Sequence, residues 1–191
     1  MTDPGAEPRP GKRERLVASA AELIHRQGVQ RTTLSEIAQA ADVPPGNVYY
    51  YFKTREELLR AVIDSWAERF GGLVESFEEQ PNPRVRLKAL ARFWAEDEEL
   101  VAASGCPVGS LCSELNKQEA GLSREAAELF KLLLAWAQDQ FRQLGCRGAR
   151  EHAFTLLAGL QGAALLADTF DDPALMTRQV RRLERWIDSL A

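Results

Sequence analysis

Apolar side chains recur at helical spacing along almost the whole chain. In one early segment Leu34, Ile37, Ala38 and Ala41 stand at positions i, i+3, i+4 and i+7, which places them on one face of a helix. No convincing run of alternating apolar and polar residues predicts a strand. The pattern therefore predicts an all-α protein of about nine helices.

Residues suited to helix ends divide the first part of the chain into short helices. Thr33 and the glutamate three residues later form a capping box, and Thr54 begins a second one. Pro45 suits the first turn of a helix, where its missing N–H is not needed. Two short helices are therefore expected, over 34–41 and 45–52, after a first helix.

Longer helices are predicted in the rest of the chain. A long helix starts at residue 54, and the next one ends in the acidic run 96–99. That run is open to two interpretations, attraction of a cationic ligand or a solvated helix end. Further helices are expected up to about residue 117 and over 123–144, 149–169 and 173–190.

Two short helices that are joined by a tight turn and docked on a preceding helix form a DNA-binding unit. In such a unit the second short helix enters the major groove of DNA. Val43 and Val48 are placed to hold the two helices together, which leaves a polar outer side. On that side Asn47 suits base edges, and Gly46 lets the backbone approach DNA closely.

The other candidates on this surface suit the DNA backbone. Tyrosine hydroxyls bind phosphate oxygens, and lysine or arginine after the helix neutralises phosphate charge. Tyr51 is expected either here or in the core, because successive helical residues point about 100° apart. The candidate DNA-binding residues are Thr33, Ser35, Pro45, Gly46, Asn47, Tyr49, Tyr50, Tyr51, Lys53 and Arg55.

The segment that runs from Thr32 to Leu58, TTLSEIAQAADVPPGNVYYYFKTREEL, resembles the helix-turn-helix of the TetR-type (TetR/AcrR) transcriptional regulators. Asp42 replaces the usual turn glycine, and Pro44 replaces the usual serine cap. The polar start of the chain, rich in proline and glycine, is expected to be a disordered leader over 1–10. The resemblance implies a helix-turn-helix DNA-binding domain over 11–53 and a helical regulatory and dimerisation domain over 54–191. It also implies a homodimer, a palindromic double-stranded DNA operator and a small-molecule effector that releases the repressor from it.

The sequence offers candidates for both functions of the second domain. Two apolar helix faces near the C-terminus could pair with a second copy, or could pack within their own domain. The residues proposed for the dimer interface are Leu156, Leu160, Ala163, Leu183, Trp186 and Ile187. Large aromatic residues and a cysteine could surround an effector, although aromatic residues on a helical stripe also serve as core. These pocket candidates are Trp66, Phe70, Phe93, Trp94, Cys106, Phe130 and Trp136.

Composition excludes several other classes of protein. The chain of 191 residues is 45% hydrophobic and 27% charged, as expected of a soluble protein. Its start has no signal peptide, and the apolar stretch 153–167 is too short to span a membrane, so we expect a cytoplasmic protein. The formal net charge is −4, but residues 1–60 carry 9 basic and 8 acidic side chains. The excess of acidic over basic residues therefore lies in the regulatory domain.

Alternative functions have weaker support. With only His25 and His152 as histidines, and no nucleophile motif or glycine-rich loop, no enzyme is expected. Neither a metal nor a cofactor is expected, and a domain that docks another protein is a further alternative. Cys106, near a predicted helix N-terminus, could instead sense electrophiles or oxidants, although most unpaired cysteines are small buried hydrophobic residues.

Overall fold

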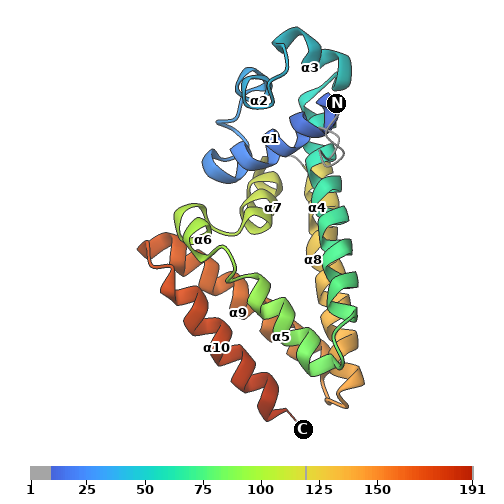
Figure 1. The fold of residues 1–191 in the computed structure, drawn as a ribbon, viewed down its shortest axis with the longest axis vertical. Coiled ribbons are helices and arrows are strands. Elements are labelled where there is room, and N and C mark those ends of the chain that lie inside the picture. The colour runs from blue at the N-terminus through green and yellow to red at the C-terminus, as the bar shows by residue number, and fades with distance from the viewer. Residues whose placement is uncertain (1–9, 119, 191) are drawn as a thin grey trace, which may run out of the picture.

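The computed structural model describes residues 10–118 and 120–190, which form ten α-helices and no strand (Figure 1). The all-α prediction is confirmed. Residues 1–9 of the predicted leader lie outside the described part of the chain. The helices are α1 (Lys12–Gln27), α2 (Leu34–Ala40), α3 (Pro45–Tyr51), α4 (Arg55–Glu78), α5 (Pro83–Phe93), α6 (Glu98–Ser104), α7 (Pro107–Gln118), α8 (Ala120–Gln143), α9 (Ala149–Phe170) and α10 (Ala174–Ser189).

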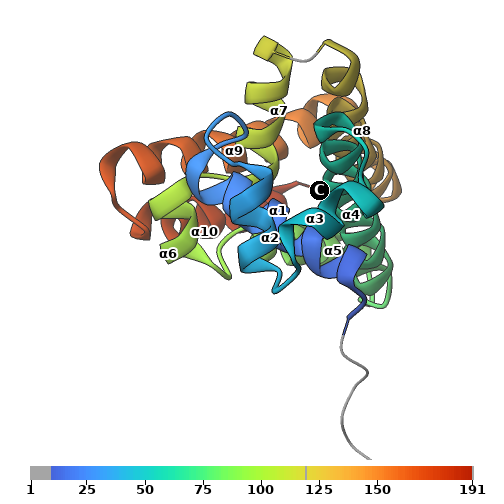
Figure 2. The same ribbon diagram turned by 90° about the horizontal axis from the view of Figure 1, so that it is seen from above.

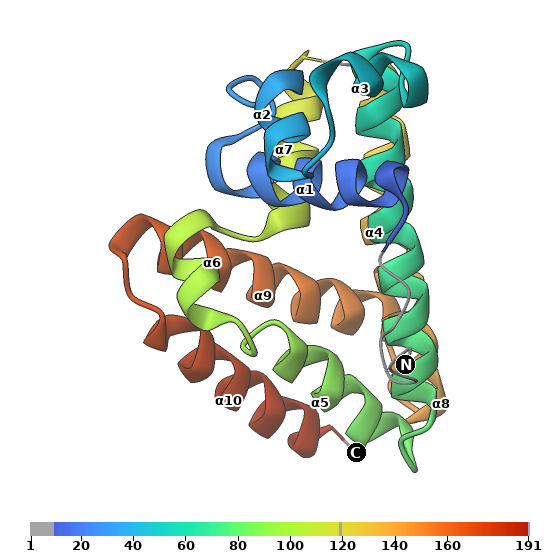
Figure 3. The ribbon, with the colours of Figure 1, turned by 45° about the horizontal axis from the view of Figure 1, so that its top comes forward.

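The short helices α1–α3 lie together at one end of the molecule (Figures 1 and 3). The core of this N-terminal unit includes Leu16 and Ala20 of α1 and Val48 of α3, which are buried. Seen from above, α1–α3 lie over the middle of the molecule, with α4 and α8 toward one side and α6, α9 and α10 toward the other (Figure 2). The first helix is thus in a position to contact both halves of the remaining fold.

The predicted capping box at the start of α2 is present. The Thr33 backbone N–H donates to the Glu36 carboxylate at 2.9 Å, and the Glu36 N–H donates to the Thr33 hydroxyl at 3.2 Å. Hydrogen bonds from the side chain and backbone of Thr33 lower the pKa of Glu36 below its ordinary value. This cap therefore stabilises α2 above the ordinary carboxyl pKa and is lost as the pH falls through the lowered value.

The helix predicted to end in the acidic run 96–99 is divided into α5 and α6. Trp94 is buried, and it packs against Phe70 with ring centroids 6.2 Å apart. The chain turns there through tight bonds, including one from the Ala95 N–H to the Arg92 carbonyl at 2.8 Å. This division adds one helix to the nine or so that the sequence predicts.

The helix α9 packs against α8, α10 and α6. By length and composition alone it could cross a membrane, with a mean hydropathy of 1.4 over an 18-residue window. In this fold 39% of that window is buried, and Leu156 and Leu160 of α9 are fully buried. The apolar character of α9 therefore provides core for the C-terminal helices.

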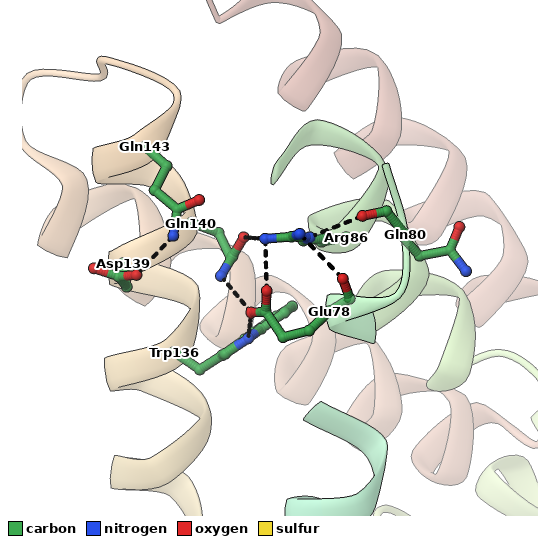
Figure 4. Close-up of polar contacts among 7 residues, drawn as sticks. All are labelled: Glu78, Gln80, Arg86, Trp136, Asp139, Gln140 and Gln143. Atoms are coloured by element: carbon green, nitrogen blue, oxygen red, sulfur yellow. Dashed lines mark hydrogen bonds and ion pairs between the residues drawn. The ribbon is translucent and has the colours of Figure 1, made fainter. Parts of the chain in front are cut away.

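A polar network joins the end of α4 to α5 and α8 (Figure 4). The Glu78 carboxylate pairs with the Arg86 guanidinium at 2.6 Å and accepts hydrogen bonds from Trp136 Nε1 at 2.7 Å and Gln140 Nε2 at 2.9 Å. Arg86 also donates to the backbone carbonyls of Gln80 and Glu78, at 3.0 Å each. The network fixes the α4–α5 turn against α8.

Replacing Arg86 with methionine is expected to lower the free energy of unfolding by about 1–3 kcal/mol, because the Glu78 carboxylate loses its cation and the carbonyls of Gln80 and Glu78 lose their donor. Equilibrium unfolding in urea measures this effect. The control is Arg124→Met, which changes an exposed arginine and should shift stability by less than about 0.5 kcal/mol. Equal losses in the two variants would show that the network is not stabilising.

Candidate DNA-binding surface and effector cavity

The outer side of α3 presents two large aromatic side chains to solvent. Tyr49 is 60% exposed and Tyr50 is 74% exposed, while Val48 between them and the turn is buried. Pro45 and Gly46 are also exposed, and Asn47 is half-buried. Tyr51 is half-buried and packs against the core, with its ring edge-to-face to that of Tyr50 at 5.0 Å. The exposed surface of α3 is thus polar and aromatic, as the sequence predicts.

Lys53 and Arg55 follow α3, and both cations are held by backbone carbonyls. Lys53 Nζ donates to the Tyr49 carbonyl at 2.9 Å and lies 5.9 Å from the centre of the Tyr50 ring. Arg55 donates to the Val29 carbonyl. Both side chains are exposed, so each can hold the local structure and still offer charge to a phosphate.

The turn between α2 and α3 adopts the backbone conformation that its residues suit. Asp42 has a φ of 52°, in the left-handed region that aspartate tolerates better than most residues. Arg15 of α1 donates to the carbonyls of Ala41 at 2.9 Å and Asp42 at 3.1 Å. This anchor was missed from the sequence, because nothing local to Arg15 indicates a partner 26 residues away.

The two remaining candidate DNA-binding residues, at the start of α2, differ in whether their hydroxyl groups are already hydrogen-bonded. Both Thr33 and Ser35 are exposed, but the Thr33 hydroxyl is engaged in the capping box, donating to Glu36 at 2.7 Å. Ser35 has no such partner within the described chain, so its hydroxyl is available to a phosphate at the helix N-terminus.

A cavity of about 700 Å³ lies at the junction of α1 with α4, α6 and α7, and we name it the junction cavity. Its volume is within the range of sites for drug-sized ligands. Five of the seven pocket candidates line it, namely Trp66, Phe70, Phe93, Trp94 and Cys106. Phe130 and Trp136 do not line it; the Trp136 ring packs on Phe77 and its N–H bonds Glu78.

The helix α1 forms one whole wall of the junction cavity. The wall consists of residues one and two helical turns apart, namely Arg13, Glu14, Val17, Ala18, Ala21, Glu22 and His25. The residue pattern of α1 indicates only support for the DNA-binding helices and gives no sign of this wall. A ligand in the cavity would contact the N-terminal unit directly.

Two hydrogen bonds connect the N-terminal unit to the α6–α7 region. His25 Nε2 lies 2.8 Å from the Gly105 carbonyl, which can only accept, so this nitrogen carries the proton. The Val29 N–H donates to the Glu114 carboxylate of α7 at 2.8 Å. These bonds join α1 and the turn after it to the far wall of the junction cavity.

The residues predicted for the dimer interface lie largely inside the chain. Five of them are buried, namely Leu156, Leu160, Ala163, Leu183 and Ile187. Trp186 is half-buried and packs on Phe141 and His152 at centroid distances of 5.7 and 5.6 Å. Surfaces that are already covered cannot meet a second copy without opening the fold. Burial in the core therefore argues against an interface role for the five buried residues, while the role predicted for Trp186 stays a prediction.

A different face of α9 carries exposed apolar side chains. We name it the α9 patch, and it consists of Phe154, Leu165, Leu166 and Phe170. Exposed Ala158 and Gly162 lie between these residues along the helix. Monomeric soluble proteins rarely expose such a contiguous apolar surface, which usually marks an interaction site.

Within the described residues, no group of three or more histidine, cysteine, aspartate or glutamate side chains could hold a metal ion. The three cysteines are free. Burial, with a smaller effect from nearby Cys106, raises the pKa of Cys112 to about 11. Cys112 is therefore a thiol rather than a reactive thiolate at neutral pH.

A three-helix unit with an exposed second short helix, joined to a larger helical domain that contains a cavity, is the architecture of a helix-turn-helix DNA-binding regulator. Residues 16–62 match the model of the bacterial regulatory proteins of the tetR family. These residues therefore form a TetR-type helix-turn-helix of the kind that transcriptional regulators carry.

Relatives and solved structures agree with this assignment. The chain is 29% identical over 187 residues to an HTH-type transcriptional regulator of Mycobacterium tuberculosis, covering 91% of this chain and 94% of the relative. It is 26% identical over 165 residues to the regulator LmrA of Bacillus subtilis, covering 82% and 86%. A TetR-family structure from Agrobacterium tumefaciens shares the fold with a TM-score of 0.84 at 20% identity, covering 94% and 98%. The relatives are transcriptional regulators, a non-enzymatic role.

Proposed function

We propose that this protein is a homodimeric repressor that binds a palindromic operator through α3 and releases it when a small molecule fills the junction cavity. Residues 11–53 act as the DNA-binding domain and residues 54–191 as the regulatory domain, in the cytoplasm. The observation that carries this proposal is the exposure of Tyr49 and Tyr50 on the second short helix of a TetR-type unit. Side chains of this kind can bind phosphates and pack on sugars or thymine methyl groups.

A gel-shift titration with the DNA that flanks the gene tests the proposal directly. Binding should weaken steeply as salt rises, because phosphate contacts release counterions. Two chains should bind each site, since a two-fold dimer matches a palindrome with half-sites about one helical turn apart. Failure to bind any flanking promoter at low salt would contradict the proposal.

The α9 patch is proposed as the dimer interface. Its residues are apolar and exposed, and an antiparallel pairing with a second copy would cover them. Such a pairing would also bring exposed Arg150, at the start of α9, toward exposed Asp171 at the end of the partner's helix. The interface is thus self-complementary in both apolar surface and charge.

Release from DNA would follow from the position of the junction cavity. A ligand that fits best when α1 moves away from α6 and α7 stabilises the states of the dimer in which that movement has occurred. In those states the two α3 helices are no longer placed to bind the operator. The bonds from His25 to Gly105 and from Val29 to Glu114 are the contacts that such a movement would break.

Glu114→Ala is expected to loosen the connection between the two domains. The Val29 amide would lose its acceptor, so its hydrogen exchange should accelerate about tenfold or more, while operator affinity falls several-fold. Amide exchange measured by NMR checks this. Glu114→Gln keeps an acceptor and should restore most of the protection, whereas unchanged exchange at Val29 in Glu114→Ala would contradict the proposed connection.

Gly46 offers a separate test of the DNA-facing surface. A Cβ at this position meets no atom within 4 Å, so Gly46→Leu should fold normally. The leucine side chain would nevertheless stand between α3 and DNA, and operator affinity should fall about tenfold or more. Normal operator binding by a folded Gly46→Leu variant would mean that this part of α3 does not approach the bases.

Thiol-based sensing is a second candidate function, supported by the position of Cys106. Cys106 lines the junction cavity, and its sulfur has the Gly109 N–H and Gln161 Nε2 each 3.4 Å away. An electrophile should then release operator from the wild type but not from Cys106→Ser. Release that persists in Cys106→Ser would exclude this mechanism. Cys112 is not expected to react near neutral pH, because its pKa is raised to about 11.

A further inference from the structure

The junction cavity has a strongly acidic lining. Two arginines line it, against the five carboxylates of Glu14, Glu22, Asp64, Glu68 and Asp97. Both arginines are placed over aromatic rings, Arg13 at 5.2 Å from the centre of Phe52 and Arg69 at 5.0 Å from that of Trp66. The lining thus has an excess of negative charge that its own cations do not balance.

Three of the lining carboxylates have neither an ion pair nor a hydrogen bond to their oxygens within the part of the chain that the structure describes. Glu14 accepts the Gly11 N–H at 2.9 Å and Glu22 pairs with an arginine on its own helix, but Asp64, Glu68 and Asp97 have no comparable partner. Asp64 and Glu68 stand one turn apart on α4, where like charges repel and weaken a helix. A bound cation would relieve this repulsion.

Aromatic side chains provide the other recognition element of the cavity. The rings of Trp66, Phe70 and Trp94 follow one another with centroids 6.0 and 6.2 Å apart, and Phe93 meets Trp94 edge-to-face at 5.5 Å. The guanidinium over Trp66 shows that the face of this ring accepts a cation. Aromatic walls beside carboxylates suit a positive charge carried on an apolar body.

We propose that the junction cavity binds an organic cation with an aromatic or otherwise apolar body. Asp64, Glu68 and Asp97 would attract the charge, and the aromatic residues would cover the body. An anion would be repelled by the carboxylates, and a hydrated inorganic cation would leave the aromatic wall without a partner. This inference rests on the proposed function, to which it adds the chemical class of the effector and its direct contact with α1.

Tetraphenylphosphonium and tetraphenylborate test the proposal, because the two ions are nearly equal in size and shape and opposite in charge. Isothermal titration calorimetry on the full chain should show binding of the phosphonium ion, and at least tenfold weaker binding of the borate ion. Affinity for the phosphonium ion should fall as salt rises, because the carboxylates are exposed. Binding of the borate ion with equal or higher affinity, or of neither ion, would overturn the proposal.

Two double variants test whether the carboxylates that attract the phosphonium ion are those of the cavity lining. Asp64→Asn with Glu68→Gln should weaken phosphonium binding about tenfold, as expected for two partly exposed charges. The control, Glu75→Gln with Glu79→Gln, removes the same charge at the same spacing near the end of α4, outside the cavity lining, and should bind as the wild type does. Equal affinities in the two double variants would overturn the proposal.

A parallel titration of operator DNA separates this inference from the proposed function. If the chain binds the phosphonium ion through Asp64 and Glu68 but binds no operator, the inference stands and the proposed function fails. If the chain binds operator and only the borate ion occupies the cavity, the proposed function stands and the inference is overturned.

Discussion

Replacing Tyr49 and Tyr50 together with alanine is expected to lower operator affinity at least a hundredfold while leaving the fold intact. The two side chains are 60% and 74% exposed, so truncating them costs the folded chain little packing. Contacts to DNA of the kind they can make contribute roughly 1–3 kcal/mol each, and a dimer loses them at two half-sites. Fluorescence anisotropy with labelled operator measures the loss.

The control for this prediction is a variant at Leu132, another exposed apolar residue, which lies on α8 away from α3. Leu132→Ala should bind operator as the wild type does. Circular dichroism and sedimentation should show that the tyrosine variant retains helix content and association state. A variant that binds operator normally, or that dissociates into monomers, would contradict the assignment of these tyrosines to the DNA surface.

The second large effect is expected at the α9 patch. Leu165→Glu places a charge at the centre of an apolar surface that we propose to be buried between two copies, so the dimer should dissociate. Leu165 is 64% exposed within the chain, and the monomer should therefore keep its stability. Sedimentation equilibrium gives the association state, and operator affinity should fall sharply because one chain binds only one half-site.

Leu160→Ala provides the contrast, since Leu160 was predicted for the interface from the sequence and is fully buried within the chain. Truncation of such a core leucine typically costs about 2–5 kcal/mol of stability. We expect this variant to unfold at lower urea concentration and to remain dimeric while folded. If Leu160→Ala dissociated the dimer without loss of stability, or Leu165→Glu stayed dimeric, the interface would lie elsewhere.

The parts of the fold that local chemistry determines could be predicted from the sequence. The capping box at Thr33, the stop and restart of helices around Pro45 and the outer side of α3 each depend on residues close in sequence. The exposed positions of Tyr49 and Tyr50 follow from the same pattern, because Val48 must face the core.

Other features depend on contacts between distant segments, and the sequence does not contain a local signal for them. The helix α9 has apolar residues on several faces, so periodicity could not separate Leu160 in the core from Leu165 on the surface. Trp136 was predicted to line a pocket, but the Glu78 carboxylate from α4 accepts its N–H and holds it elsewhere. The wall that α1 gives to the junction cavity likewise exists only once α1 has packed on α4.

The most direct test of the account is an anisotropy titration of the wild-type protein with DNA that flanks its gene, followed by the same titration with the Tyr49→Ala, Tyr50→Ala variant. We predict saturable, salt-sensitive binding of two wild-type chains per site and at least a hundredfold weaker binding of the variant. Wild-type binding that is absent at low salt, or equal binding by the two proteins, would contradict operator recognition through α3.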